Sequence, residues 1–248
     1  MSPDRRQHRG AHPADRELFS DTQLPCLRVA VAELSWLLTR SYAPKAALKL
    51  VGDKFNLTDR QRLAVARAAC SDQNLVTRAS TNISVESVAD QQIIIDGFNL
   101  IITIEASLSG GVLLLCRDDC IRDLSSVHGS YRAVSETETA IVLIGEQLEQ
   151  LRVQSVEWIL DQPISNSGRL AKLMREVAAT RGWPWKVDLL FNPDERIVSS
   201  ERVAITSDSV VLNRVARWLN FKRYLIEKRL PNSWIIDLKT KEAGNTRL

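Results

Sequence analysis

Hydrophobic and polar residues follow two different spacings along the chain, and the change lies near residue 80. Between residues 27 and 69, apolar side chains recur every three or four positions, which predicts short amphipathic helices. After residue 90, short apolar runs alternate with helical patterns, which is typical of parallel strands joined by helical crossovers. We therefore expect an α/β protein whose mostly parallel sheet is flanked by helices and preceded by a small all-helical domain. Residues 1–22 should form a flexible arm, residues 23–80 the helical domain and residues 81–248 the α/β domain.

The helical domain should contain three short helices. Leu27, Val31 and Leu34 share one face of the first helix, and Pro44 follows its end. A capping-box spacing begins the third helix, and residues 72–90, rich in Ser, Asn and Thr, should be a connection. Arginines on the outer face of the third helix make the unit similar to a helix-turn-helix that docks on nucleic acid. A solvated helix surface is the other interpretation.

The second part of the chain should alternate strands and helices. Strands are expected over residues 91–95, 153–160, 185–191, 202–206 and 234–238, with helices over residues 136–151, 165–181, 211–219 and 224–230. The run Ile93-Ile94-Ile95 is apolar without interruption, which indicates a central strand buried on both faces. Asp96 and Gly97 follow it at the carboxyl edge of the sheet, where open α/β folds place their sites. Glycine at this point would let a ligand or metal approach the backbone.

Three of the expected strands lead into an aspartate: Asp96, Asp161 and Asp208. Because neighbouring parallel strands lie about 5 Å apart, carboxylates at their carboxyl ends should meet in one crevice. Several carboxylates close together repel one another unless a cation neutralises them, and oxygen ligands favour Mg²⁺ or Mn²⁺. A single Asp after a strand is often only a helix cap, so the prediction of a site depends on finding all three.

The composition is that of an ordinary soluble globular protein, with 44% hydrophobic and 25% charged residues and a net charge of +3. The four cysteines lack zinc-binding spacing and indicate reduced thiols in a cytoplasmic protein. The first twenty residues lack the apolar core of a signal peptide, and no apolar run approaches the length of a membrane span. We expect no association with membranes, and a homo-oligomer is compatible with the sequence.

Several of these stretches carry a family resemblance. Ile93-Ile94-Ile95-Asp96-Gly97-Phe98-Asn99 resembles the first motif of the PIN/NYN/FEN nuclease superfamily, residues 158–161 its middle strand and residues 204–209 its late strand. Residues 126–129 resemble the start of a helix in flap-endonuclease-like members. From about residue 25 to 225, the chain resembles an uncharacterised bacterial and archaeal family in which a helical domain of unknown function precedes a PIN-like domain. Residues 47–55 and 127–132 carry that second likeness.

The resemblance implies roles for individual residues. Asp96, Asp161 and Asp208 would be catalytic metal ligands, directly or through water. Asn99 would hold the Asp96 loop or a water, and Thr206 and Ser207 would orient Asp208 or a phosphate oxygen. Two further substrate contacts follow from local sequence: Arg169 at an expected helix N-terminus, where amide groups favour anions, and His128 beside a glycine. Simple capping, and a hydrogen-bonded structural histidine, are the alternatives for these two positions.

The fourth acidic ligand of the superfamily has no distinctive counterpart. Glu136, Glu138, Asp194 and Glu195 are the candidates, although Pro193 suggests a turn at the last two. Asp118, Asp119 and Asp123 are expected to line a solvated loop.

The sequence thus predicts a Mg²⁺- or Mn²⁺-dependent nuclease that hydrolyses phosphodiester bonds in a nucleic acid, with RNA favoured over DNA. The alternative is a PIN-like module with an incomplete site that binds RNA or a protein. A nucleotide-dependent enzyme ranks last, because no glycine-rich phosphate motif follows a strand.

Overall fold

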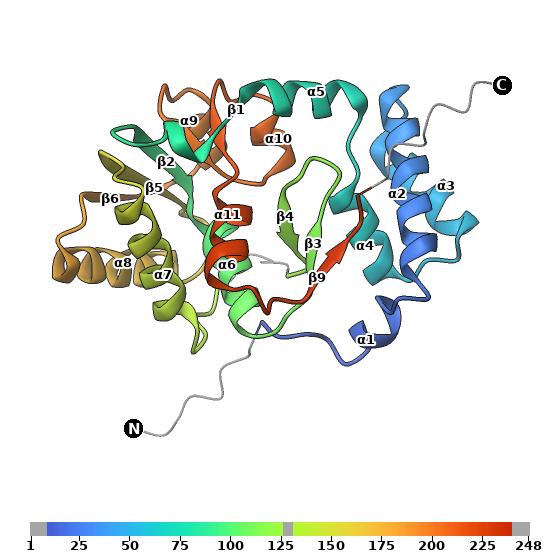
Figure 1. The fold of residues 1–248 in the computed structure, drawn as a ribbon, viewed down its shortest axis with the longest axis horizontal. Coiled ribbons are helices and arrows are strands. Elements are labelled where there is room, and N and C mark those ends of the chain that lie inside the picture. The colour runs from blue at the N-terminus through green and yellow to red at the C-terminus, as the bar shows by residue number, and fades with distance from the viewer. Residues whose placement is uncertain (1–8, 126–130, 240–248) are drawn as a thin grey trace.

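The computed structural model describes residues 9–125 and 131–239, which form a helical region beside an α/β region (Figure 1). The helices are α1 (Asp15–Leu18), α2 (Leu24–Thr39), α3 (Pro44–Lys54), α4 (Asp59–Ala68), α5 (Asp72–Thr81), α6 (Gly97–Leu108), α7 (Thr137–Gln150), α8 (Ser167–Arg181), α9 (Pro193–Val198), α10 (Ser209–Leu212) and α11 (Phe221–Arg229), with a 3₁₀ turn at Val85–Ser87. The strands are β1 (Asn82–Ile83), β2 (Gln92–Asp96), β3 (Leu113–Leu115), β4 (Ile121–Asp123), β5 (Ser155–Asp161), β6 (Trp185–Leu190), β7 (Val203–Ile205), β8 (Trp218–Leu219) and β9 (Ile235–Asp237).

Helices α2 to α5 form the helical domain. The Thr58 hydroxyl and the Gln61 side chain make the expected capping box at the start of α4. The expectation of a connection over residues 72–90 is wrong for its first part, because the Ser71 hydroxyl accepts from the Asn74 amide and caps α5. Polar residues that favour loops therefore begin a helix here, since Ser at an N-cap satisfies an amide that the helix leaves open.

The arginines of α4 are partly exposed, and each binds another group of the protein. Arg60 binds the carboxylate of Asp15, and Arg62 binds Asp53 at 2.8 Å. Arg67 donates to carbonyl oxygens at the end of β4 and beyond it. These guanidinium groups connect α4 to α1, to α3 and to the end of β4.

The described part of the expected arm, residues 9–22, lies against the rest of the protein. Asp15 is fully buried beside Arg60, and Phe19 belongs to the core of the helical domain. Arg9 pairs with Glu105, which is fully buried on α6 of the α/β domain. The segment therefore contacts both domains.

Six strands form one parallel sheet in the order β1-β8-β7-β2-β5-β6, as the strand–helix alternation predicts. Strand β2 is central, between β7 and β5, and its three isoleucines are fully buried. The chain leaves β2 toward β5 and β6 and then crosses back to β7 on the other side. The carboxyl end of β2 is thus a switch point, where open α/β sheets leave a crevice.

Helices cover both faces of this sheet, and the strand alternation decides which side chain meets which layer. Ile93 and Ile95 pack with α6, α7, α8 and α11, whereas Ile94 packs with residues of α9 and α10. The same alternation in β5 and β7 sends Ile159 and Ala204 to the α9–α10 side. Asp96 and Asp161 follow two residues later on their strands, so they belong to that side as well.

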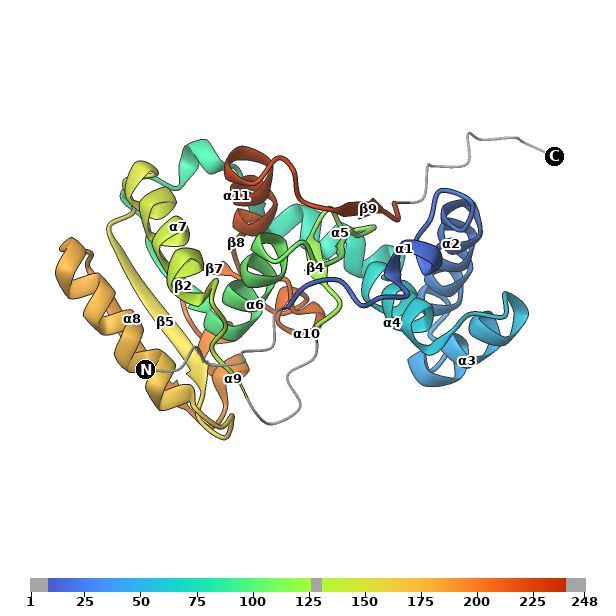
Figure 2. The ribbon, with the colours of Figure 1, turned by 90° about the horizontal axis from the view of Figure 1, so that it is seen from below.

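A second, three-stranded sheet has the order β4-β3-β9 and lies between the large sheet and the helical domain (Figures 1 and 2). Strand β9 was expected as the last strand of the chain, and it pairs with β3 in parallel in this small sheet. Leu114 and Ile236 from the two strands complete the core of the helical domain. The helical domain therefore shares its core with the C-terminal strand.

Two local predictions in the last third of the chain are wrong. The expected helix over residues 211–219 ends at Leu212, and Trp218–Leu219 forms β8, which pairs with β1 and β7. A turn was expected at Pro193, but Pro193 is the first residue of α9. Proline fits at this position because the first amide of a helix has no partner within the helix, so the N–H that proline lacks is not needed.

The four cysteines are free thiols, as expected. Among residues 9–125 and 131–239, no helix is long and apolar enough to cross a membrane.

Candidate functional site

Asp96 ends β2 and is also the N-cap of α6, because its carboxylate accepts from the Asn99 amide at 3.4 Å. Its second oxygen accepts a hydrogen bond from the Thr206 hydroxyl at 2.9 Å. Gly97, which was expected to open space for a ligand, instead lies against β5: a Cβ atom there would come within 2.5 Å of Leu160 and 3.0 Å of the Ile159 carbonyl oxygen. The glycine therefore allows α6 to start directly over the sheet.

Asp208 reaches the same point from β7. One of its oxygens accepts from the amides of Val210 and Val211, so the residue caps α10. Its own amide donates to the Thr206 hydroxyl at 3.0 Å, and that hydroxyl donates to Asp96. Thr206 therefore links the two aspartates, and its register beside β2 explains why they meet.

The carboxylates of Asp96 and Asp208 also interact through their charges. Burial raises the pKa of Asp96 to about 6, and the charge of Asp208 adds to that rise. The hydrogen bond from Thr206 and the charge of Lys222 oppose it. Asp96 therefore becomes a carboxylate only near neutral pH, in surroundings that penalise its negative charge.

Asp161 lies further out along the sheet. In the β2–β5 register, Asp96 is level with Ile159, so Asp161 is two residues beyond it on the neighbouring strand. Two steps of about 3.3 Å and one strand spacing of about 4.8 Å put the two Cα atoms roughly 8 Å apart. Burial raises the pKa of Asp161.

Among the four candidates for a further acid, Asp194 is the one that the structure brings to the other aspartates. Burial raises the pKa of Asp194, and the charges of Asp208 and then Asp161 raise it further. It stands in the first turn of α9, on the sheet face toward which Asp96 and Asp161 project. The charge of Asp194 thus interacts with those of both Asp208 and Asp161.

The other three candidates lie elsewhere. Glu195 is exposed and forms an ion pair with Arg214 at 2.7 Å. Glu136 and Glu138 belong to the start of α7, which packs on the opposite face of the sheet.

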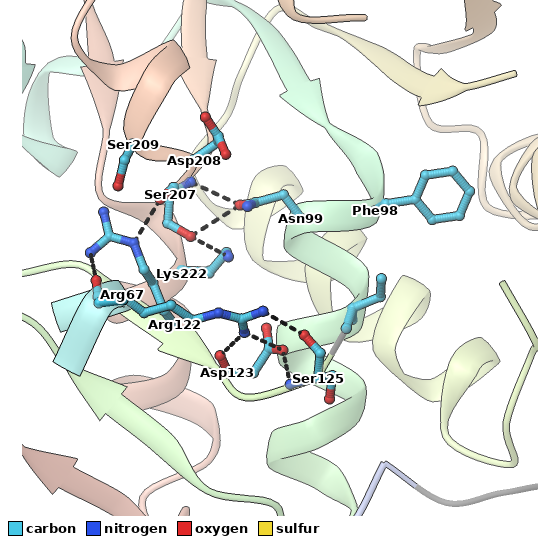
Figure 3. A pocket seen from close by; sticks show the side chains of 12 residues that line it. Arg67, Phe98, Asn99, Arg122, Asp123, Ser125, Ser207, Asp208, Ser209 and Lys222 are labelled. Carbon is cyan, nitrogen blue, oxygen red and sulfur yellow. Dashed lines mark hydrogen bonds and ion pairs between the residues drawn. The ribbon is translucent and has the colours of Figure 1, made fainter. Parts of the chain in front are cut away.

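A cavity of about 400 Å³ opens on the other side of Asp208 (Figure 3). Its wall combines three cationic side chains, hydroxyl, amide and carboxylate groups, and the apolar side chains of Ala66, Phe98 and Ile102. The lining residues are Ala66, Arg67, Phe98, Asn99, Ile102, Arg122, Asp123, Ser125, Ser207, Asp208, Ser209 and Lys222. Arg67 comes from the helical domain, so both domains build this cavity.

Lys222 extends from α11 into this cavity and is only 4% exposed. Its ammonium group donates to the Ser207 hydroxyl at 2.6 Å and the Thr103 hydroxyl at 2.9 Å. Ser207 in turn donates from its amide to the Asn99 side-chain oxygen at 2.8 Å. Burial lowers the pKa of Lys222 to about 8, against the opposing influence of Asp123 and Asp96.

Asp123 and Asp118, which were expected on a solvated loop, are both buried. Asp123 accepts from the Thr103 hydroxyl at 2.6 Å and lines the cavity. Asp118 binds Arg78 and Arg122. Burial opposes the charge of Asp118, but the two guanidinium groups outweigh it and hold its pKa well below the usual range. The signal missed in the sequence was the i, i+4 pair of Asp118 and Arg122, which a hairpin brings together.

Of the five residues expected to contact substrate, three lie beside Asp96 and Asp208. Asn99, Thr206 and Ser207 lie beside Asp96 and Asp208, joined by the hydrogen bonds described above. Arg169 is exposed on the first turn of α8 and is not part of the cavity lining. His128 lies outside the described residues. Sequence reasoning missed Lys222, because a lysine in a charged helical run gives no sign that it is buried.

The donor atoms offered by the four aspartates are carboxylate oxygens, which suit a hard divalent cation. In the described part of the chain, no group of three His, Cys, Asp or Glu side chains is placed to hold a metal ion. The 8 Å offset of Asp161 is consistent with that finding. Asp96 and Asp208, linked through Thr206, are the pair best placed to act together.

Comparison with known proteins identifies related families of unknown function. The family described as "Domain of unknown function (DUF5616)" matches residues 85–224, and "Protein of unknown function (DUF434)" matches residues 26–80. The "Uncharacterized protein MJ0935" of Methanocaldococcus jannaschii is 32% identical over 183 residues, which cover 74% of this chain and 87% of that protein. No solved structure matches the chain significantly. The expectation of an uncharacterised family is confirmed: the chain belongs to the family of the domain of unknown function DUF5616.

Proposed function

We propose that the protein is a metal-dependent nuclease with a PIN-like α/β domain that hydrolyses phosphodiester bonds, with RNA as the favoured substrate. The observation that carries this proposal is the position of Asp96 and Asp208. They share the Thr206 hydroxyl at the switch point of the sheet, in surroundings where their charges repel. A cavity with Arg67, Arg122 and Lys222 lies directly beside them. Acidic and basic groups side by side suit a substrate that is itself an anion and binds together with a cation.

The absence of a three-ligand cluster among the described residues is compatible with Mg²⁺ or Mn²⁺. Mg²⁺ commonly binds proteins through one or two carboxylates and completes its shell with water and substrate phosphate. Asp96 and Asp208 would be the direct ligands, and Asp161 and Asp194 would contact the ion through water. A bound cation would activate a water and offset the charge that develops on the phosphate.

The residues around the pair have roles of their own in this proposal. Thr206 and the Asn99 amide hold the Asp96 carboxylate in one orientation, which limits the entropy lost on binding an ion. Asn99 fixes the Ser207 amide and so sets the path of the loop that carries Asp208. The PIN-like assignment itself is supported by the central β2 strand with Asp96 at its end and by β5 and β7 as its neighbours.

The test is cleavage of end-labelled RNA and DNA by the purified full chain in Mn²⁺, Mg²⁺ or EDTA. Asp96→Asn and Asp208→Asn should each reduce cleavage by at least 100-fold, because a neutral amide is a poor ligand and cannot offset the cation. Asp188→Asn, which changes an aspartate paired with Lys186 on β6, is the matched control and should keep full activity. Equal cleavage by Asp96→Asn and wild type would refute the proposal.

A second candidate function is a binding module without cleavage, and the lack of a three-ligand metal cluster in the described residues favours it. In that case Mn²⁺ would neither raise the melting temperature nor support cleavage, while the protein would still retain labelled RNA or a protein partner. A rise in melting temperature with Mn²⁺ that disappears in Asp96→Asn would contradict this alternative.

A further inference from the structure

The cavity beside Asp208 lies where the helical domain meets the α/β domain. Arg67 on α4 forms one wall, and Ser207, Ser209 and Lys222 come from the α/β domain (Figure 3). Its volume of about 400 Å³ lies within the range of pockets that hold small ligands. Pockets at domain junctions with a few convergent polar groups are common binding sites.

Lys222 is the unusual feature of this cavity. Its side chain is 4% exposed, yet no described carboxylate lies within ion-pair distance of its ammonium group. Two of its three N–H groups donate hydrogen bonds to the hydroxyls of Thr103 and Ser207, which carry no charge. A buried cation whose direct hydrogen-bond partners are neutral is costly. The charges of Asp123 and Asp96 lower that cost in part, and an anion in the cavity would lower it further.

The neighbouring charges also leave a positive excess. Asp118 binds both Arg78 and Arg122, so one carboxylate faces two guanidinium groups. Asp123 is occupied by the Thr103 hydroxyl, the Ser125 amide and, at 3.6 Å, Arg67. Among the residues that line the cavity, three cationic side chains, those of Arg67, Arg122 and Lys222, therefore face two carboxylates, Asp123 and Asp208.

Two carboxylates in the lining would repel an anion, and both are engaged. Asp123 accepts the bonds described above, and one oxygen of Asp208 accepts from the amides of Val210 and Val211. These bonds offset part of the negative charge that the two carboxylates present to the cavity. Asp208 is also the residue whose charge a cation would offset under the proposed function.

We propose that this cavity is a binding site for a single phosphate group, with Lys222, Ser207 and Ser209 on one side and Arg67 of the helical domain on the other. The ligand class is a terminal phosphate group, supplied by the end of a nucleic-acid strand as a phosphate monoester or by free inorganic phosphate. The strand-end source rests on the proposed nuclease function, because the cavity adjoins Asp208. The phosphate site itself does not depend on it.

The first experiment uses inorganic phosphate and the full-length protein in EDTA, so that no metal is involved. Calorimetric titration at pH 7.5, with chloride at equal ionic strength as the reference, should give saturable binding. Lys222→Met should weaken this binding at least tenfold, and Ser209→Asp, which puts a like charge at the cavity, should do the same. Lys172→Met is the control, because Lys172 is 77% exposed on α8.

Circular dichroism and melting curves check that each variant is folded, and Ser209→Asp keeps the test valid if Lys222→Met does not fold. Wild-type binding no stronger than in chloride would overturn the proposal. Equal phosphate affinity in wild type and a folded Lys222→Met or Ser209→Asp variant would do the same.

The second experiment separates the two sources of phosphate. Non-cleaving Asp96→Asn is titrated with one short RNA that carries a 5′-phosphate, a 3′-phosphate or only hydroxyl ends. Tighter binding of one phosphorylated end, by tenfold or more, supports a strand end, and inorganic phosphate should compete with it. Equal binding of all three overturns the strand-end source. Phosphate binding in a wild-type protein that cleaves no nucleic acid would reject the nuclease proposal and leave the phosphate site standing.

Discussion

Replacing Asp96 by asparagine should stabilise the protein at pH 8 even though it removes a proposed ligand. Asp96 has a pKa of 3.8 in an unfolded chain and about 6 in the fold. The folded state therefore holds the Asp96 proton more tightly, and the stability that this proton gives is lost as pH rises through about 6. The difference between the two pKa values corresponds to roughly 3 kcal/mol.

Asparagine cannot ionise, so the variant avoids this loss. Its single side-chain oxygen can still accept the bond from Thr206, and only the long 3.4 Å bond from the Asn99 amide is given up. Below pH 4, the variant and the wild type should have nearly the same free energy of unfolding. The difference, or gap, between them should grow between pH 4 and pH 7. For a chain of this size, a gain of roughly 3 kcal/mol raises the melting temperature by roughly 6 to 12 °C.

Urea denaturation followed by tryptophan fluorescence at pH 4 and pH 8 measures the gap directly. Asp188→Asn, the control, loses only a surface ion pair and should change stability by at most about 1 kcal/mol. Adding Mn²⁺ at pH 8 should narrow the gap, because a ligand at 100 times its dissociation constant stabilises wild type by about 2.7 kcal/mol. A variant less stable than wild type at pH 8, or a gap independent of pH, would refute the reasoning.

Three further predictions concern the fold, and each is measured by the free energy of unfolding in urea. Arg9→Met leaves Glu105 buried without its cation and should cost about 3 to 5 kcal/mol at pH 7, with Arg9→Lys closer to wild type; a loss below 1 kcal/mol would contradict the buried pair. Thr58→Ala removes a capping box and should cost about 1 kcal/mol, whereas Thr58→Ser should be nearly neutral. Gly97→Ala pushes a methyl group against Leu160 and should cost about 1 to 3 kcal/mol; an unchanged stability would show that α6 moves freely over β5.

The periodicity of the sequence was sufficient to predict those elements whose own residues determine which face is buried. The uninterrupted isoleucines of β2 predicted a central parallel strand, and the aspartate after it lies at the switch point of the sheet. Helices α7 and α8 also lie close to their expected ranges.

Elements that depend on distant partners were missed. Strands β1 and β8 have two residues each and exist because they pair with each other and with β7. The candidate site likewise contains residues that the sequence predicts and residues that it does not. Asp96 and Asp208 follow strands that can be recognised, whereas Lys222 gains its role only when α11 packs beside Thr103 and Ser207.

Because the helical domain and β9 share one core, a shortened form of the protein must keep both of them. Ile236 and Leu238 lie beyond both family matches, yet they are buried among residues of α2, α3 and α4. A fragment cut at residue 224 would expose those apolar side chains to water and to other molecules. The two family regions should therefore unfold together as one cooperative unit, and expression boundaries should include β9.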